Sequence, residues 1–401
     1  MDIPAKCILT RRSAQSDNSR LEVPAQSPPV LCKVLGRPDC FAALYTVTLR
    51  AAYALYALIM LDHLRPDPGV VESNAFTDHL IPPADRFYYA MLGVWERHDT
   101  LWYLHIARHG YDRSAAIVFY PLYPLLIRAV SWLVHPPVLA ALVFSTTASF
   151  FFFWGLQVLV EFDLPRSTAV KTVYLAGLWP ASFMLLAGYP DSLVAAFTVW
   201  SLCFARKQNW WLAGLLGMFA AASKAVGCVV VIPLAFLGWR SRNRSAVASA
   251  LCVLPVFVYS LWTRLSGLGS ISEAYQQHWH TSAEFPWVTL ARCVHRFVSV
   301  GPDPLFKLNL GLFALICCLA LLTPVRNEYK LYAAAALLVF LSKNTDPLLQ
   351  STMRYVLVVF PAFIGLALWM KRGVGLIVLS AFLLLINGVL LLTFFKWSLI
   401  V

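Results

Sequence analysis

The chain contains 401 residues, and 59% of them belong to the apolar set AVILMFWYC. Charged residues make up only 13%, about half the share of roughly 25% that is typical of soluble domains. A soluble fold has too little interior to hide that much apolar surface, so we expect the bilayer to be the solvent for most of it. The composition excludes a disordered chain, a collagen, a coiled coil and a disulfide-rich secreted scaffold.

The formal net charge is +12, yet the chain has no run of five or more basic residues. In a membrane protein such an excess is typical of short cytoplasmic loops that face anionic lipid, so we expect no nucleic-acid partner. The nine cysteines are scattered, without a CxxC pair or a metal-binding spacing. This pattern indicates thiols that serve as small apolar side chains.

Eleven apolar segments predict about 11 transmembrane helices in an all-α, polytopic protein. They are 41–61, 138–160, 170–187, 190–205, 210–222, 225–239, 246–264, 305–323, 330–342, 354–370 and 374–395. Several are shorter than the roughly 20 residues of a straight span, as is allowed where a helix is buried in protein or lines a cavity. Residues 1–40 are polar, so we expect a disordered cytoplasmic arm without a cleavable signal peptide, followed by one membrane domain over 41–401.

Lys and Arg set the expected orientation. Residues 1–40 carry six of them, so this end is placed in the cytoplasm. Alternating the segments then makes every inner turn basic, as the positive-inside rule requires. The inner turns hold Arg166, Lys171, Arg206, Lys207, Arg240, Arg242, Arg244, Arg326, Lys330, Lys371 and Arg372. Two long polar stretches, 62–137 and 265–304, fall on the outer side.

The stretch 62–137, the first extracytoplasmic loop, is the only part of the chain in which acids are concentrated. Its partly apolar piece VFYPLYPLLIRAVSWLV is interrupted by Pro121, Pro124 and Arg128. Such a piece is typical of a helix that lies along the membrane surface, with its aromatic rings at headgroup level. We therefore expect membrane-surface helices in this loop.

Residues 95–128 contain three histidines and three acids among aromatic side chains. Asp99 stands where an apolar run begins, between Trp95 and Tyr103. We expect it at the membrane boundary, beside rings that suit a sugar or a lipid headgroup. A solvated loop with an aromatic belt is the alternative.

Further charged residues fall at the outer ends of predicted spans. Tyr189 and Asp191 lie in one outer turn, Lys224 lies in the next, and Arg354 begins a later segment. An ionisable residue within hydrocarbon costs roughly 2.5–3.5 kcal/mol and is a functional candidate. Snorkelling or turn capping is the alternative. Because all these residues share one side with Asp99, they predict a cavity of mixed charge that suits a charged lipid headgroup and a polar acceptor.

At this point the motifs resemble those of a known family. The pieces HDTLWY, IARHGY and FYPLYPLLIR resemble the first-luminal-loop signature of the GPI mannosyltransferase 2 (PIG-V type) family. The pieces LWPASFMLLAGYPDSLVAAF and STMRYVLVVFPAF resemble two later family segments, in the same order over roughly 90–370. Two positions depart from the family pattern: His98 replaces a Trp, and Lys224 replaces an Arg.

The resemblance implies an integral-membrane GT-C glycosyltransferase with a polyprenyl- or dolichyl-phosphate sugar donor. Mannose is the sugar that the resemblance favours. The resemblance also implies a glycolipid or glycan acceptor on the extracytoplasmic or lumenal side of a bacterial plasma membrane or of the endoplasmic reticulum. Asp99 matches the loop acid that is expected to be the catalytic base. Candidates for substrate binding are Glu96, His98, Tyr103, Tyr189, Asp191, Lys224 and Arg354.

The chemistry of the residues fits an inverting transfer. One carboxylate takes the proton of the attacking hydroxyl, which is typically worth about 10²–10⁴-fold, and Glu96 is the alternative base. The leaving group is a phosphate, so a cation such as Arg354 or Lys224 is a more useful partner than a second acid. We expect no cofactor and no metal. A transporter or flippase of a lipid-linked sugar, and a non-catalytic subunit of a membrane complex, are the rival hypotheses.

Overall fold

The structure is a computed structural model of the chain. It describes residues 37–64, 76, 80–299, 304–345, 348–349, 351–370 and 373–398. Most of the arm expected over 1–40 lies outside these residues. Within the described residues the fold is almost entirely helical, and its two short strands form one antiparallel pair. The all-α class expected from the sequence is therefore confirmed.

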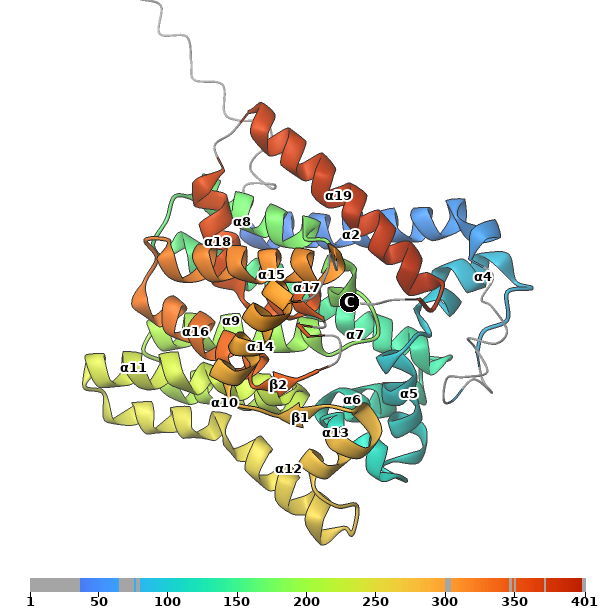
Figure 1. The fold of residues 1–401 in the computed structure, drawn as a ribbon, viewed down its shortest axis with the longest axis horizontal. Helices are drawn as coiled ribbons and strands as arrows, with labels where there is room; N and C mark the ends of the chain where they lie inside the picture. The colour runs from blue at the N-terminus through green and yellow to red at the C-terminus, as the bar shows by residue number, and fades with distance from the viewer. Residues whose placement is uncertain are drawn as a thin grey trace, which may run out of the picture.

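The first half of the chain alternates long helices with short ones (Figure 1). Its elements are α2 (Pro38–Ile59), η1 (Leu61–His63), α4 (Arg86–Met91), η2 (Gly93–Trp95), α5 (Asp99–His109), η3 (Ser114–Val118), α6 (Leu122–Ser131), α7 (Pro137–Glu161), α8 (Arg166–Leu178), η4 (Ser182–Leu185), α9 (Asp191–Arg206), α10 (Trp210–Ser223), η5 (Ala225–Val230) and α11 (Val231–Ser241). Proline begins α2 and α7, where its missing N–H costs no helical hydrogen bond.

The second half continues the bundle and adds the strand pair. Its elements are η6 (Arg244–Cys252), α12 (Leu254–Leu265), α13 (Ile271–Trp279), β1 (Ser282–Ala283), α14 (Pro286–Ser299), α15 (Pro304–Cys317), the π-helical η7 (Cys318–Leu322), α16 (Asn327–Leu341), β2 (Lys343–Asn344), α17 (Thr352–Tyr355), η8 (Val356–Val358), α18 (Phe360–Trp369) and α19 (Val374–Phe395). Helices α2, α8, α11 and α16 run across the view, and α12 and α19 cross it obliquely (Figure 1).

All eleven apolar segments expected from the sequence are helical over most of their length. Among the described residues, four helices are long and apolar enough to cross a membrane, and a bent pair made of 352–358 and 360–369 can be a fifth span. Several of the other segments are apolar helices of 10–17 residues. The structure thus agrees with a helical membrane protein, whereas the count of about 11 spans is not confirmed and stays a prediction.

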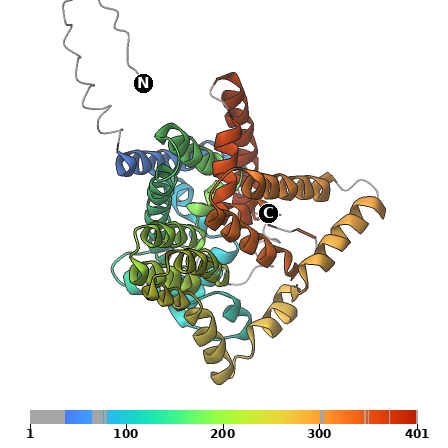
Figure 2. The ribbon, with the colours of Figure 1, turned by 90° about the vertical axis from the view of Figure 1, so that its left-hand side faces the viewer.

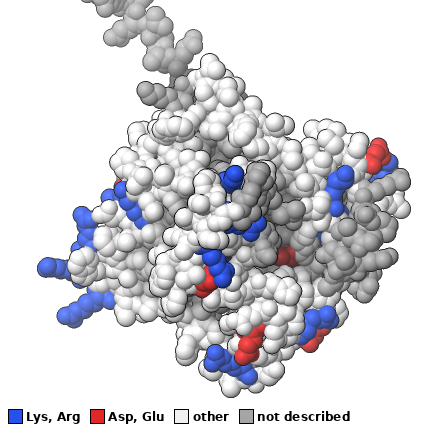
Figure 3. All heavy atoms as spheres, in the orientation of Figure 1, with Lys and Arg blue, Asp and Glu red and all other residues white. Residues whose placement is uncertain are grey.

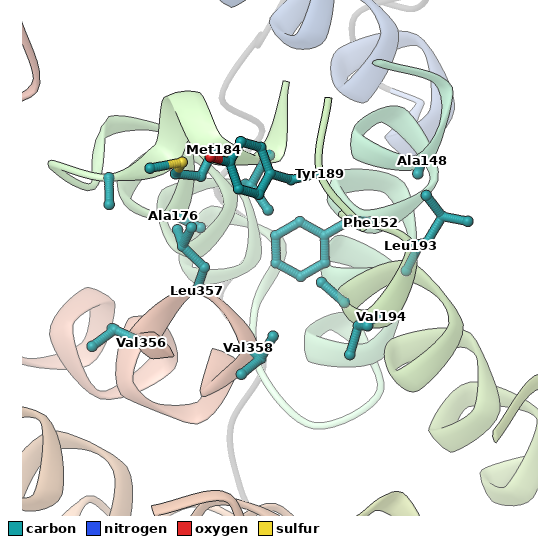
Figure 4. Close-up of a cluster of buried hydrophobic side chains, with 14 of the residues drawn as sticks. Ala148, Phe152, Ala176, Met184, Tyr189, Leu193, Val194, Val356, Leu357 and Val358 are labelled. Atoms are coloured by element: carbon teal, nitrogen blue, oxygen red, sulfur yellow. The ribbon is translucent and has the colours of Figure 1, made fainter. Parts of the chain in front are cut away.

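Buried apolar side chains from several segments meet at the centre of the bundle (Figure 4). Phe152 of α7 lies beside Tyr189, which precedes α9, and Leu357 of η8 approaches from the other side. Close packing of such side chains fixes the relative positions of the helices that carry them. Helix η8 follows directly on α17, so this core also fixes the position of Arg354.

A polar side chain inside α19 ties that helix to the segment before α9. The Nδ2 group of Asn387 donates to the carbonyl oxygens of Trp179 and Pro180 and contacts Oγ of Ser182, each at 3.1 Å. A buried amide needs such partners, because an unpaired one costs about 1–3 kcal/mol. The contacts therefore hold the turn that leads into Tyr189 and Asp191.

The second half of the chain also forms an arm. From α12 through α14 (yellow to orange) the chain swings out from the bundle, and α15 lies back against it (Figure 2). The arm is fastened where β1 pairs with β2, with Ser282 opposite Asn344 and Ala283 opposite Lys343. This pairing fixes the chain just after α16, next to the residues described below.

Charge is unevenly distributed along the molecule. Lys and Arg side chains gather at the left end, where α11 turns into η6, whereas acidic side chains are seen mainly toward the middle and the right end (Figure 3). The basic turn contains Arg240, Arg242 and Arg244. This distribution agrees with the inner turns expected from the sequence.

Candidate active site

A cavity of about 470 Å³ lies between the two halves of the chain. Its walls come from α5, from the segments that flank α9 and α10, from the arm, and from α15 to α17. Its charged lining residues are Asp99, Lys224, Lys343 and Arg354, joined by His98 and by the tyrosines Tyr103, Tyr120, Tyr189, Tyr275 and Tyr355. The cavity brings together most of the residues that the sequence singles out.

An ion cluster lies on one wall of the cavity. Nη1 of Arg354 is 2.8 Å from Oδ2 of Asp99, and Nη2 of Arg354 is 2.9 Å from Oδ2 of Asp191. Nζ of Lys224 is 2.9 Å from the other oxygen of Asp191. The Asp191 side chain is only 3% exposed, whereas the Asp99 side chain is 26% exposed. Asp191 is thus the buried anchor of two cations, and Asp99 is the carboxylate that a bound molecule can reach.

The two carboxylates occupy equivalent positions on their helices. Asp99 is the first residue of α5 and Asp191 is the first residue of α9. A helix N-terminus carries a partial positive charge, so a carboxylate there is favoured by typically 0.3–1 kcal/mol. The sequence at these points begins a helix with an acid, and tertiary packing then places both acids on one guanidinium.

A close backbone approach brings α5 to the turn that precedes α9. A Cβ atom at Gly188 would lie 2.5 Å from Cγ2 of Thr100, a distance that real Cβ contacts do not reach. Only glycine permits this packing, and Thr100 directly follows Asp99. The approach therefore sets the position of Asp99 relative to the turn that carries Tyr189 and Asp191.

The residue before α5 has an unusual backbone conformation. His98 has a φ of 49°, a region that a bulky side chain seldom adopts. Its ring lies beside Phe394 and Trp397, and burial lowers the pKa of the imidazole. His98 is thus a neutral ring in the cavity wall, and its Nε2 atom is buried without a hydrogen-bond partner among the described residues.

The short α17 presents Arg354 from the opposite side. Ser351, before it, has a φ of 64°, and Nε1 of Trp179 donates to the carbonyl oxygen of Met353 at 2.8 Å. The guanidinium carbon of Arg354 lies 4.4 Å from the centre of the Tyr189 ring. A guanidinium over an aromatic face gains about 0.5–2 kcal/mol. The Tyr189 ring therefore packs against the guanidinium group of Arg354 and is not itself a partner in the ion pairs.

Tyr103 lies one helical turn after Asp99, on the same face of α5. Its ring makes edge contacts with Phe119 and Tyr123, each with ring centres 5.1 Å apart. The ring is almost fully buried but contributes to the cavity wall. This position suits a side chain that shapes the wall beside Asp99.

Glu96 is not among the residues that line the cavity, unlike the other residues of this loop expected to bind substrate. Its side chain is buried, and Oε2 accepts a hydrogen bond of 2.8 Å from the backbone N–H of Ile81. Burial raises the pKa of Glu96 to about 6. The proximity of Glu96 to Asp99 in the sequence suggested a second acid in the site, but the chain between them turns its carboxylate toward the loop that precedes α4.

Sequence reasoning missed a further cation in the cavity, which is hydrogen-bonded to a tyrosine. Nζ of Lys343 lies 2.6 Å from the Oη atom of Tyr355, and it also lies 5.9 Å from the centre of the Tyr275 ring. Lys343 directly follows a predicted span, so in the sequence it resembles an ordinary flanking lysine. Tyr355 stands next to Arg354, which was the signal that could have found this side of the site.

The wall beside Lys343 is apolar. It comes from α15 and α16 and is made of Phe313, Ile316, Ala336, Leu337, Val339 and Phe340. The ring of Phe340 lies 4.9 Å from that of Tyr355, so the apolar wall begins directly next to the polar end. The cavity therefore offers a charged half and an apolar half to one occupant. In the described part of the chain, no group of three or more His, Cys, Asp or Glu side chains could hold a metal ion.

Comparison with known proteins finds mannosyltransferases. GPI alpha-1,6-mannosyltransferase 2 of Rattus norvegicus is 28% identical over 206 residues, which cover 48% of this chain and 40% of that protein. The protein of the same name in Homo sapiens is 26% identical over 193 residues, 44% of this chain and 37% of that protein. A polyprenol-phosphate-mannose-dependent alpha-(1-2)-phosphatidylinositol pentamannoside mannosyltransferase of Mycolicibacterium smegmatis is 28% identical over 226 residues, 52% of this chain and 50% of that protein.

No family model matches the chain, and no solved structure matches it significantly. The aligned part of the chain spans half or less of the length of each of these curated relatives. The resemblance expected from the loop motifs is nevertheless confirmed, because relatives found by comparison of whole sequences carry the same family name. The chain is similar to the GPI alpha-1,6-mannosyltransferases 2 and to a mannosyltransferase that depends on polyprenol-phosphate-mannose.

Proposed function

We propose that this chain is a membrane mannosyltransferase. It moves a mannosyl residue from a polyprenyl- or dolichyl-phosphate donor to a hydroxyl group of a glycolipid acceptor, with inversion at C1. The observation that carries the proposal is the ion pair of Asp99 and Arg354 in a cavity that also has an apolar wall. The names of the curated relatives supply the sugar and the class of donor.

Asp99 is the proposed general base. Its carboxylate removes the proton from the acceptor hydroxyl as that oxygen forms a bond to C1 of mannose. The bond between C1 and the phosphate oxygen breaks, and its electron pair leaves with the phosphate. Proton transfer by a positioned carboxylate is typically worth about 10²–10⁴-fold in rate, and the partly exposed Asp99 is the acid of the ion cluster that an acceptor can approach.

Arg354 links the base to the leaving group. Before the reaction its Nη1 group is held by Asp99. Once Asp99 has taken the proton, this carboxyl is neutral and the charge-assisted hydrogen bond weakens. Nη1 of Arg354 is then free to stabilise the charge that develops on the departing phosphate, a role for which a guanidinium is well suited. Asp191 keeps the rest of the guanidinium in place.

The donor and the acceptor need different parts of the cavity. The apolar wall of α15 and α16 suits the beginning of the polyprenyl chain, and the charged half suits the phosphate and the sugar. The relatives' names, which refer to GPI and to a phosphatidylinositol pentamannoside, favour an acceptor built on phosphatidylinositol. Tyr103 and His98 are the proposed contacts for sugar hydroxyl groups.

The proposal includes a topology. The chain crosses the membrane about eleven times, with the basic turns in the cytoplasm and the cavity on the extracytoplasmic or lumenal side of a bacterial plasma membrane or of the endoplasmic reticulum. Support comes from the basic end of the molecule in Figure 3 and from the helical state of all eleven segments. The bent pair of α17 and α18 is a broken span, which is allowed where it lines a cavity.

Mannosyl transfer by the purified, detergent-solubilised protein tests this proposal. The protein is incubated with polyprenyl-phosphate mannose or with a nucleotide mannose, and with a panel of acceptors that includes phosphatidylinositol glycolipids. We expect a new glycolipid only with the polyprenyl-phosphate donor, and an anomeric configuration at C1 opposite to that of the donor. A product that retains the donor's configuration, or transfer from the nucleotide sugar alone, contradicts the proposed mechanism.

The same preparation separates the rival functions. A transporter or flippase moves the lipid-linked sugar across a reconstituted vesicle and keeps this activity in Asp99→Asn. A non-catalytic subunit transfers nothing from any donor until a partner is added. The mannosyltransferase proposed here loses transfer in Asp99→Asn and still binds the donor lipid.

A further inference from the structure

We propose that Lys343, held by Tyr355, is the side chain that binds the phosphate of the lipid-linked donor before the reaction. This inference rests on the proposed function, because it assigns the donor phosphate to one place in the same cavity. Neither the loop motifs nor the relatives' names point to Lys343, which lies outside every motif quoted above.

The three cations of the cavity differ in their partners. Arg354 is paired with Asp99 and Asp191, and Lys224 is paired with Asp191. In contrast, Lys343 has no carboxylate among its described contacts: its polar partner is the Oη atom of Tyr355, at 2.6 Å. An ammonium group has three donors, so two of them remain for a ligand in the cavity.

The charge of the cavity also favours a bound anion. Among the described residues, three cations face two carboxylates, which leaves one positive charge that belongs to Lys343. A polyprenyl-phosphate sugar is a phosphodiester with a single negative charge, so its binding makes the cavity neutral. Because a charge in a poorly solvated site is costly unless it is paired, this balance favours a monoanion over a neutral lipid.

Lys343 lies at the junction of the two halves of the cavity. Phe340 and Leu337 of the apolar wall lie on α16, the helix that ends just before Lys343. On the other side, Lys224 and Arg354 line the charged half. A polyprenyl-phosphate sugar has the same order of parts: an apolar chain, then a phosphate, then a polar sugar.

Contacts of its backbone and of its ammonium group hold Lys343 in place. Its backbone belongs to the ladder between β1 and β2, opposite Ala283, and the N–H of Glu284 donates to the carbonyl oxygen of Ser342 at 2.9 Å. Its ammonium lies 4.7 Å from the centre of the Tyr355 ring and near the Tyr275 ring. A lysine that only snorkels toward water needs no such frame. The frame is consistent with a preorganised anion site.

Equilibrium binding of the phosphodiester farnesyl methyl phosphate, compared with farnesol, tests the inference on the full-length protein in detergent. The ratio of the two dissociation constants measures the contribution of the phosphate. In Lys343→Met we expect this ratio to fall by about ten- to hundredfold, the range for a lost hydrogen bond to a charged group. Lys343→Arg is expected to keep most of the ratio, and the exposed Lys207, changed to Met, is the matched control.

A role in folding alone moves both ligands together and leaves the ratio unchanged, so that result overturns the inference. Tyr355→Phe covers the case in which Lys343→Met does not fold: it removes the hydroxyl that holds the ammonium, and we expect a smaller fall of the ratio. An unchanged ratio in Tyr355→Phe contradicts the inference as well.

The readouts keep the two proposals apart. If the wild type transfers mannose but Lys343→Met keeps the wild-type ratio, the inference fails and the proposed function stands. If the wild type transfers no mannose from any donor and the ratio depends on Lys343, the transferase function fails and the lipid-phosphate site stands. A ratio near one in the wild type overturns the inference whatever the transfer assay gives.

Discussion

Oδ2 of Asp99 lies 2.8 Å from Nη1 of Arg354, a residue 255 positions later in the sequence. The pair joins the stretch between α2 and α7 to the last third of the chain. Asp191 completes it from a third segment, so the cluster forms only in the folded protein. This geometry is the basis of the predictions below.

Arg354→Lys tests whether the guanidinium fork is needed. Lysine keeps the charge but cannot hold Asp99 and Asp191 at once through separate N–H groups. We expect kcat to fall by about 10²–10³, the loss typical of one donor to a developing negative charge. The exposed Arg113, changed to Lys, is the control in the same mannosyl transfer assay. A kcat within threefold of the wild type contradicts the role given to Arg354.

Gly188→Ala tests the close approach of α5 to the turn before α9. The new Cβ atom meets Cγ2 of Thr100 at 2.5 Å, so α5 must shift and Asp99 with it. A misplacement of about 1 Å can cost on the order of 10²-fold in rate, and we expect kcat to fall by at least tenfold. The double variant with Thr100→Ala removes the obstacle and is expected to recover most of the activity.

Gly311→Ala is the matched control for that experiment, because a Cβ at Gly311 meets no described atom within 4 Å. It is expected to leave kcat unchanged. If Gly188→Ala behaves like Gly311→Ala, the packing at Gly188 does not position the base.

The pH dependence of stability tests the assignment of Glu96 as a structural residue. Burial raises the pKa of Glu96 from 4.5 to about 6. Because the folded-state pKa is the higher one, Glu96 stabilises the fold below about pH 4.5, and this contribution is lost as the pH rises through about 6. The loss amounts to about 2 kcal/mol.

Glu96→Gln removes this titration and keeps an oxygen that can accept the hydrogen bond from Ile81. Thermal unfolding of both proteins in detergent between pH 4.5 and pH 7.5 is the measurement. We expect the Tm of the wild type to fall relative to that of the variant as the pH rises. Parallel pH profiles would mean that Glu96 titrates normally and is not buried as described.

Chelation tests whether side chains supply all the positive charge that the leaving phosphate needs. The described residues of the cavity include Lys224, Lys343 and Arg354, and the proposed mechanism uses no metal. We expect mannosyl transfer to keep its rate after treatment with excess EDTA. A loss that is restored by adding a divalent cation contradicts this part of the mechanism.

Much of the fold follows from the sequence. Long apolar runs indicate segments that lie in lipid, and the charged residues beside them indicate where those segments end. The limits of α2, α7 and α19 agree with the expected segments to within a few residues. The number of spans does not follow in the same way. A helix as short as α18 can be part of a span only if neighbouring protein segments cover the backbone at the break before it. Whether they do depends on how the helices pack.

Site residues could be predicted from the sequence where a charged residue stands in an apolar segment. They could not be predicted where the residue looks ordinary in its sequence context. Asp191, Lys224 and Arg354 stand out as charges in apolar surroundings, and the structure brings them together. Glu96 lies next to the site in sequence but faces away from it, since a backbone turn cannot be inferred from residue types alone. Lys343 is held beside the cavity by the pairing of β1 with β2, in which Ser282 lies opposite Asn344, 62 positions later in the sequence.

The single-turnover rate of Asp99→Asn, with the polyprenyl-phosphate mannose donor already bound, tests the central claim most directly. Asparagine keeps the size of the side chain and removes the base. We expect the rate constant for transfer to fall by about 10²–10⁴ at an unchanged dissociation constant for the donor, while Asp112→Asn, an exposed aspartate of the same loop, transfers like the wild type. A rate within tenfold of the wild type, or an equal loss in Asp112→Asn, contradicts the assignment of Asp99 as the base.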